Sequence, residues 1–114
     1  MSINVVMLVG YVGRDPEVRQ LQSGNTVARI SLAVNSGKSY NETDWFNLEL
    51  WDKQAQVVSE YVRRGSLLGI VGSLRVDSWT DRNSHMQHSR PVIRVNQLQL
   101  FGYKRDSQLN PHNT

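Results

Sequence analysis

Hydrophobic and polar residues alternate along two stretches in the first half of the chain. In "TVARISLAVN" (residues 26–35) every second position from 28 to 34 is apolar, with arginine and serine between. In "DWFNLELW" (residues 44–51) Phe46, Leu48 and Leu50 share one side of an extended chain, because successive side chains of a strand point to opposite faces. Both patterns are typical of half-buried strands.

Short apolar runs between glycines, prolines and polar clusters predict three further strands and a hairpin. The strands cover residues 3–12, 67–76 and 91–101, and residues 17–21 are expected to pair briefly with a neighbour. Neither face of the last strand is cleanly apolar, so the pattern leaves its register open. The polar segment 78–89 is predicted to project as a hairpin.

A short helix is predicted directly after the strand that contains Trp45 and Trp51. Asp52 is the expected N-cap, because its carboxylate can accept hydrogen bonds from the first turn. Arg63 and Arg64 are expected in the last turn, where cations suit the negative end of the helix dipole. Gly65 then follows as the residue after the helix end. The inward stripe consists of Ala55, Val58, Tyr61 and Val62.

The order of these elements predicts an all-β fold with three strands, one helix and two more strands. Gly69 and Gly72 inside the fourth strand indicate bends or close backbone contacts, as at the corners of a small barrel. We predict a five-stranded OB-fold barrel with one short helix between strands 3 and 4 and projecting hairpins. Residues 1–103 would form this domain, and residues 104–114 a short, disordered polar tail.

Composition narrows the possible chemistry. The 114 residues include no cysteine, which excludes disulfides, thiolate metal sites and thiol nucleophiles. The longest apolar runs are too short to span a bilayer and no secretion signal is visible, so we expect a cytoplasmic protein. The net charge of +3 is compatible with a polyanionic partner, although many ordinary enzymes carry as much.

The sequence offers little support for catalysis. Its carboxylates are scattered among turns and strands, and no nucleophile elbow or phosphate-binding loop is present. His85 and His88 lie in the polar hairpin without an obvious third ligand, so they do not indicate a metal site. We therefore predict that the protein is not an enzyme and that it binds no cofactor.

Aromatic residues on polar segments are more informative. Trp45 and Trp51 share the polar side of their strand, Trp79 lies in the hairpin, and Tyr40 lies in the preceding loop. Such rings can cover the core or fill a subunit contact. Alternatively, they can form a platform on which the bases of single-stranded nucleic acid stack.

Cations near these aromatic residues favour the platform. An interface for a single strand needs rings for the bases and cations for the phosphates. Glu49, between the two tryptophans, argues mildly against a uniformly basic groove. The cations that lie near the aromatic residues are Lys38, Lys53, Arg63, Arg64, Arg75 and Arg82.

Over about residues 3 to 102 the chain resembles bacterial single-stranded DNA-binding proteins. The resemblance rests on "VMLVGYVGRDPEVR", "DWFNLELWDKQAQVVSEYVRRGSLLGIVGSLR", "WTDR" and "VIRVNQLQLFG". The segment "DWFNLELWDK" looks like the cyanobacterial branch. The resemblance implies a nucleoid-associated OB-fold homotetramer that binds single-stranded DNA with little sequence preference and protects it in replication, recombination and repair.

The resemblance also implies roles for individual residues. Trp45, Trp51 and Trp79 match its base-stacking aromatics, although the position of Trp51 usually holds phenylalanine. Lys38 stands where a further stacking tryptophan is common, with Tyr40 as a substitute. The residues that match positions near the DNA backbone are Arg19, Lys53, Arg63, Arg64 and Arg75. Asp77 and Ser78 occupy positions where basic residues are common in the family. We therefore expect the hairpin to bind phosphate less strongly than in other members.

The resemblance is looser at the subunit contacts and at the end of the chain. Phe46 stands where a histidine is familiar at one contact, and Leu67 and Gly69 replace larger polar residues near the second. The family usually continues into a flexible linker and an acidic tip that recruits replication and repair proteins, whereas this sequence stops at "DSQLNPHNT". Whether it is trimmed or naturally short stays open, and so does its recruitment of such proteins.

The alternative to a single-stranded DNA-binding function is a short OB-fold interaction protein of the primosomal kind, which binds mainly other proteins.

Overall fold

The computed structural model describes residues 2–35, 37 and 42–103, so Lys38, Tyr40 and the tail of residues 104–114 lie outside the described residues. The described chain forms six strands and one helix. In chain order these are β1 (Val6–Val12), β2 (Glu17–Gln20), β3 (Thr26–Asn35), β4 (Thr43–Trp51), α1 (Lys53–Tyr61), β5 (Ser66–Thr80) and β6 (Gln87–Tyr103). The short β2 confirms the brief pairing expected over residues 17–21.

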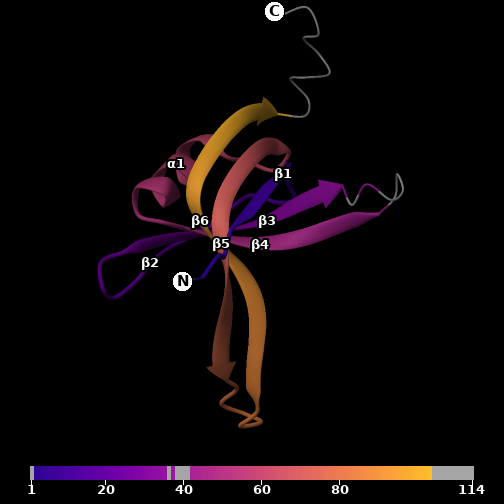
Figure 1. Ribbon diagram of the computed structural model, residues 1–114. Coiled ribbons are helices and arrows are strands. Elements are labelled where there is room, and N and C mark those ends of the chain that lie inside the picture. Colours follow the sequence, from indigo (N-terminus) through magenta and orange to yellow (C-terminus); the bar gives the residue numbers. More distant parts are fainter. Residues whose placement is uncertain (1, 36, 38–41, 104–114) are drawn as a thin grey trace, which may run out of the picture.

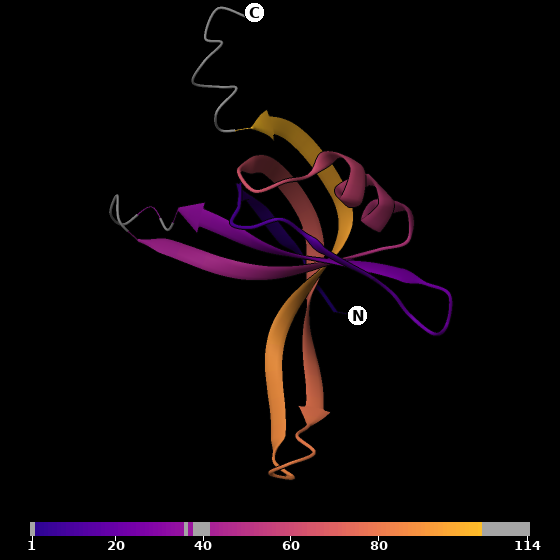
Figure 2. The same cartoon turned by 180° about the vertical axis from the view of Figure 1, so that it is seen from behind.

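The strands form one sheet in the order β1-β5-β6-β4-β3-β2, and a further pairing between β1 and β3 closes it into a ring. The ring therefore contains five strands, and β2 extends from it along β3. All pairings are antiparallel except β4 with β6, which run parallel. Figure 1 and Figure 2 show the strands crossing tightly at the centre, with α1 covering one end. This arrangement confirms the predicted all-β fold with one helix.

The interior of the ring is filled by the inward residues of the alternating strands. Leu32 on β3, Leu48 and Leu50 on β4, and Leu68 on β5 are fully buried, and Val58 from α1 joins them. Burying one such side chain contributes about 1.5–3 kcal/mol relative to leaving it in water. The alternation predicted for β3 and β4 is thereby confirmed, and it fixes which residues of β4 point outward.

A register shift explains why β6 has no cleanly apolar face. Val71 of β5 pairs with Gln97, but the next residue, Gly72, pairs with Val95, so Asn96 is an extra residue in β6. Such a bulge reverses the inward and outward positions on either side of it. The core side of β6 changes from odd-numbered residues, Ile93 and Val95, to the even-numbered Leu98, which pairs with Ile70 and packs against the core.

Two glycines let neighbouring backbones approach closely at the corners of the ring. A Cβ atom on Gly72 would lie 2.3 Å from the carbonyl oxygen of Arg94, and one on Gly10 would lie 2.3 Å from that of Ala33. The corner predicted at Gly72 is confirmed. Gly69 differs, because an added Cβ would meet the ring of Phe101 at 2.7 Å on the outside of the sheet.

The helix is shorter than predicted. It ends at Tyr61, so the expectation of Arg63 and Arg64 in its last turn was wrong. The Arg63 guanidinium still donates to the carbonyls of Ser59 and Val62, at 3.0 and 2.7 Å, and so satisfies acceptors at the helix end. Gly65 has a positive φ of 91° but lies beyond the residue after the helix end, so its predicted capping role was also wrong.

The N-terminus of the helix differs as well. Asp52 precedes the first helical residue, as predicted, but it makes no side-chain cap hydrogen bond within the described part of the chain. Its carboxylate accepts instead from the backbone N–H of Thr26, at 3.1 Å. Asp52 therefore joins the end of β4 to the start of β3 rather than stabilising the first turn.

Strands β5 and β6 continue beyond the ring as a long hairpin, which points downward in Figure 1 and Figure 2. The hairpin was predicted, but its strands were expected to stop at residue 76 and to resume at 91. The pairing of β5 with β6 continues through mostly polar residues to Thr80 and Gln87, because the hydrogen bonds between strands need only backbone groups. At its base the side chain of Asn4 exchanges two hydrogen bonds, at 2.8 and 2.9 Å, with the backbone of Leu74.

Candidate nucleic-acid interface

Trp45 lies on the outward side of β4 and is 60% exposed. Its ring rests against the loop after β1, since a Cβ atom on Gly13 would lie 2.3 Å from Cζ3 of the indole. The backbone N–H of Gly13 donates to the carbonyl of Ser31 on β3, at 3.0 Å, which holds this loop in place. An exposed indole is thus positioned by a residue that has no side chain.

Trp51, at the other end of the same strand, is held by two charged neighbours. Its indole Nε1 donates to Oε1 of Glu49 at 2.7 Å, and Nη2 of Arg94 on β6 approaches the same oxygen at 3.3 Å. The Arg94 guanidinium lies over the Trp51 ring, 4.8 Å from its centroid. Glu49 is only 7% exposed, so the acid expected to point into the groove is instead covered by its partners.

Trp79 lies on the projecting part of β5 and is 48% exposed. The imidazole of His88 stacks on its ring, with centroids 5.6 Å apart and planes at 24°, and the Arg90 guanidinium lies 6.0 Å from the ring centroid. Nε2 of His88 also faces Asp81 at 3.9 Å.

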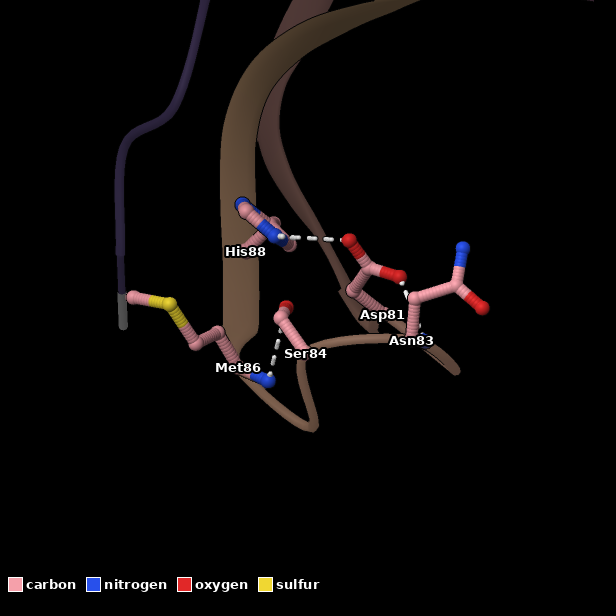
Figure 3. A network of polar contacts seen from close by, with 5 residues as sticks. All are labelled: Asp81, Asn83, Ser84, Met86 and His88. Atoms are coloured by element: carbon pink, nitrogen blue, oxygen red, sulfur yellow. Dashed lines mark hydrogen bonds and ion pairs between the residues drawn. The ribbon is translucent and has the colours of Figure 1, made fainter.

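The turn of the hairpin is tied by short-range contacts, which Figure 3 shows from close by. Asn83 donates its backbone N–H to the Asp81 carboxylate at 2.9 Å, and Met86 donates to the Ser84 hydroxyl at 3.3 Å. Among the residues that the structure describes, no group of three or more potential ligands could hold a metal ion.

The strand register places all three tryptophans on one side of the sheet. Glu49, which shares its side of β4 with Trp45 and Trp51, lies beside Arg94 of β6, and Arg94 pairs with Ser73 of β5. The β5–β6 pairing is continuous from there to Thr80, so alternate residues from Ser73 reach Trp79 on that same side. We call this side, defined by Trp45, Trp51 and Trp79, the tryptophan face.

Three arginines that the sequence pattern did not single out belong to this face. Arg29 pairs with Glu49, Arg94 covers Trp51, and Arg90 lies near Trp79. Arg29 and Arg90 line a depression of about 140 Å³, whose polar lining consists of Arg14, Asp15, Glu17, Arg29, Ser31, Asn47 and Arg90. The alternation of β3 could have identified Arg29, whereas Arg90 and Arg94 depend on the register of β6.

The predicted cations divide into two groups. Arg19 and Arg75 are exposed on the tryptophan face, because Arg19 pairs with Val27 opposite Trp51 and Arg75 alternates with Trp79 on β5. Arg82 is exposed in the turn of the hairpin.

The remaining cations lie near the helix. Lys53 is the first residue of α1 and lines a shallow depression between α1 and β6. Arg63 contacts the helix end, and the backbone N–H of Arg64 donates to the Asp15 carboxylate at 2.8 Å. The Arg63 side chain is thus turned to the end of the helix, and the roles of Lys53 and Arg64 near DNA stay predictions.

A different outward surface, on β1, β5 and β6, is apolar. Met7, Val9 and Phe101 are exposed there, and the ring of Phe101 lies over Gly69. A depression of about 290 Å³ beside them is lined by residues of the same three strands. Leu67 belongs to this surface through its pairing with Tyr11. Phe46 does not, since it lies on the inward side of β4, half-buried against the core.

No helix in the described part of the chain is long and apolar enough to cross a membrane.

The closed ring and its outward aromatic face define the class of protein. A small, strongly twisted β-ring with one helix, carrying rings and cations on one side, is the arrangement through which OB-fold proteins bind oligonucleotides. The sequence model of the single-strand binding protein family matches residues 3–101 of this chain.

Similar proteins are known from several cyanobacteria. Single-stranded DNA-binding protein 1 of Nostoc sp. (strain PCC 7120) is 54% identical over 93% of this chain and 89% of its own. Single-stranded DNA-binding protein 1 of Synechocystis sp. (strain PCC 6803) is 53% identical over 94% and 90%, and the single-stranded DNA-binding protein of Thermosynechococcus vestitus is 51% identical over 96% and 92%. The chain therefore belongs to the single-strand binding protein family, and the resemblance to its cyanobacterial branch is confirmed.

Proposed function

We propose that the protein binds single-stranded DNA with little sequence preference and protects it during replication, recombination and repair. The observation that carries this proposal is the tryptophan face, where three indoles at least partly open to solvent lie on one side of the sheet with arginines between them. The names of the relatives from Nostoc and Synechocystis support it.

Stacking explains why the binding would be insensitive to sequence. Every base has a π-face, and a base stacked on an aromatic ring contributes about 1–3 kcal/mol whatever its identity. A duplex hides these faces between neighbouring base pairs, so rings on an open surface favour single strands.

The phosphates would follow the arginines. Arg29 and Arg90 line the same depression, and Arg19 and Arg75 lie on the tryptophan face as well. Each phosphate neutralised by a cation releases counterions, so binding of this kind weakens as salt rises. The chemistry is binding alone, so in this proposal the protein is not an enzyme and needs no cofactor. We expect it in the cytoplasm, associated with the nucleoid where single strands arise.

The proposal includes assembly into a homotetramer. Exposed apolar side chains on β1, β5 and β6 form a contiguous outward surface, and such surfaces commonly become contacts between subunits. Four chains of net charge +3 would carry 4 × 3 = +12, which strengthens the attraction of DNA. Leu67 and Gly69 lie on this surface, and the contact through Phe46 stays a prediction. The mass of the particle in solution, measured by analytical ultracentrifugation, tests the assembly.

A titration with oligo-dT tests the binding. We expect strong quenching of tryptophan fluorescence, because stacked bases quench indoles, and an affinity that falls steadily as salt rises. A double-stranded oligonucleotide of the same length is the control and should bind much more weakly. An unchanged signal at micromolar oligo-dT would refute the proposal and favour the alternative of an OB-fold protein that binds mainly other proteins.

A further inference from the structure

A buried acid in the middle of a surface for a polyanion needs an explanation. Glu49 lies between Trp45 and Trp51 on β4, it is 7% exposed, and its side chain is turned toward Trp51 and Arg94. A carboxylate on this side would repel phosphates unless its charge were compensated. The Arg94 guanidinium at 3.3 Å supplies that compensation, so the pair adds no net charge to the face.

The contacts among Glu49, Trp51 and Arg94 constrain the Trp51 side chain most. An indole has a single hydrogen-bond donor, and in Trp51 this donor points to Glu49 at 2.7 Å. Its ring is covered by the Arg94 guanidinium at 4.8 Å, within the range of a cation–π contact. One contact fixes the edge of the ring and the other fixes one of its faces. Together they determine both angles by which a tryptophan side chain can turn.

Stability alone does not account for the arrangement. The Nε atom of Arg94 is buried and finds no hydrogen-bond partner among the described residues. An ion pair with one partly exposed partner contributes little to stability, and here one polar atom also remains unsatisfied. What the pair does hold is the Trp51 indole, whose N–H would lose its acceptor if position 49 were apolar.

We propose that Glu49 and Arg94 are positioning residues that hold the Trp51 indole in place for stacking and leave one of its faces to a base. The inference rests on the proposed binding of single-stranded DNA and deepens it. Because Arg94 occupies one face, Trp51 stacks a single base rather than inserting between two. Because Glu49 fixes the indole N–H, the ring does not have to be ordered when DNA binds, which removes part of the entropic cost of binding.

The test uses Glu49→Leu, which keeps the size of the side chain and removes the acceptor. We expect oligo-dT to bind about tenfold more weakly, since a freed ring loses part of its stacking. The dependence on salt should become no shallower, because no phosphate contact is lost and the Arg94 guanidinium, left without its carboxylate, adds positive charge to the face. Glu49→Gln keeps an oxygen that can accept from the indole, so its affinity should return to within about twofold of the original protein. Glu60→Leu, on the exposed side of α1, is the matched control and should leave the affinity unchanged.

A second background separates positioning from a general effect on the fold. With Trp51→Ala already in place, Glu49→Leu should cause no further loss, because the ring that it positions is gone. In a protein with Trp45→Phe and Trp79→Phe, Trp51 is the remaining tryptophan of the three in the sequence. Its time-resolved fluorescence anisotropy should then decay faster when Glu49→Leu is added.

The outcomes are distinct. If the original protein does not bind oligo-dT, the proposed function fails. If it binds, but Glu49→Leu binds equally well or weakens binding equally in the Trp51→Ala background, the positioning role is overturned. Should Glu49→Leu fail to fold, the double variant Glu49→Leu/Arg94→Leu replaces it, because it removes both partners of the ion pair and leaves neither charge uncompensated on the face. This variant should also bind more weakly only when Trp51 is present.

Discussion

Substituting Gly13 by alanine should weaken DNA binding without unfolding the protein. The added Cβ would lie 2.3 Å from Cζ3 of Trp45, and ordinary contact begins near 3.4 Å, so the two atoms must separate by about 3.4 − 2.3 = 1.1 Å. The backbone of Gly13 is tied to Ser31, whereas the Trp45 ring is 60% exposed and can turn away. We therefore expect the ring to move and the strand to stay.

The effects on stability and on binding should then differ. Gly13 is not among the described glycines with a positive φ, so alanine suits its backbone, and the free energy of unfolding should change by less than about 1 kcal/mol. A stacked base contributes about 1–3 kcal/mol, and a displaced ring should lose about 1 kcal/mol of it, or roughly fivefold in affinity.

Oligo-dT titration and thermal melting measure the two quantities on the same samples. The Trp45→Ala background is the control, because Gly13→Ala should cause no additional loss of affinity once the ring is absent. An unchanged affinity of Gly13→Ala, together with an unchanged environment of the Trp45 indole in its NMR spectrum, would refute the role assigned to this contact.

Two further substitutions test the ring and the assembly. Gly72→Ala places a Cβ 2.3 Å from the backbone oxygen of Arg94, which cannot turn aside, so we expect a loss of about 3 kcal/mol in the free energy of unfolding by urea denaturation. Met7→Lys puts a charge on the apolar outward surface of β1. Because the Met7 side chain is 72% exposed in a single chain, the substitution should not disturb the fold of that chain. Ultracentrifugation should show a smaller particle of normal fold, and a particle of unchanged mass would contradict the assignment of this surface.

Local pattern was sufficient wherever a strand alternates without interruption. The faces of β3 and β4 follow from period two alone, which is why the outward positions of Trp45 and Trp51 could be predicted. In β6 the extra residue Asn96 reverses that period, and nothing in the sequence around it marks the position of the bulge. Arg94 was missed for this reason.

Pairing between distant segments could not be predicted from local pattern. The side of the sheet that carries Trp79 depends on the register of β5 with β6 and on the parallel contact of β6 with β4. The helix end was misplaced because Arg63 satisfies the terminal carbonyls from outside the helix, where composition cannot distinguish it from a last-turn residue. Glu49 was interpreted as an exposed acid because its partner Arg94 lies 45 residues away.

The two tryptophans of β4 have in common that residues from other elements set their positions. Trp45 rests on the loop after β1, and Trp51 is fixed by Glu49 together with Arg94 of β6. Ordering a side chain on binding costs about 0.5–1.5 kcal/mol, comparable with a sizeable part of one stacked base. A protein that reads no sequence cannot recover this cost through base-specific hydrogen bonds. Rings that are already held in place lower this ordering cost equally for every base. The affinity for single strands therefore rises without any gain in sequence preference.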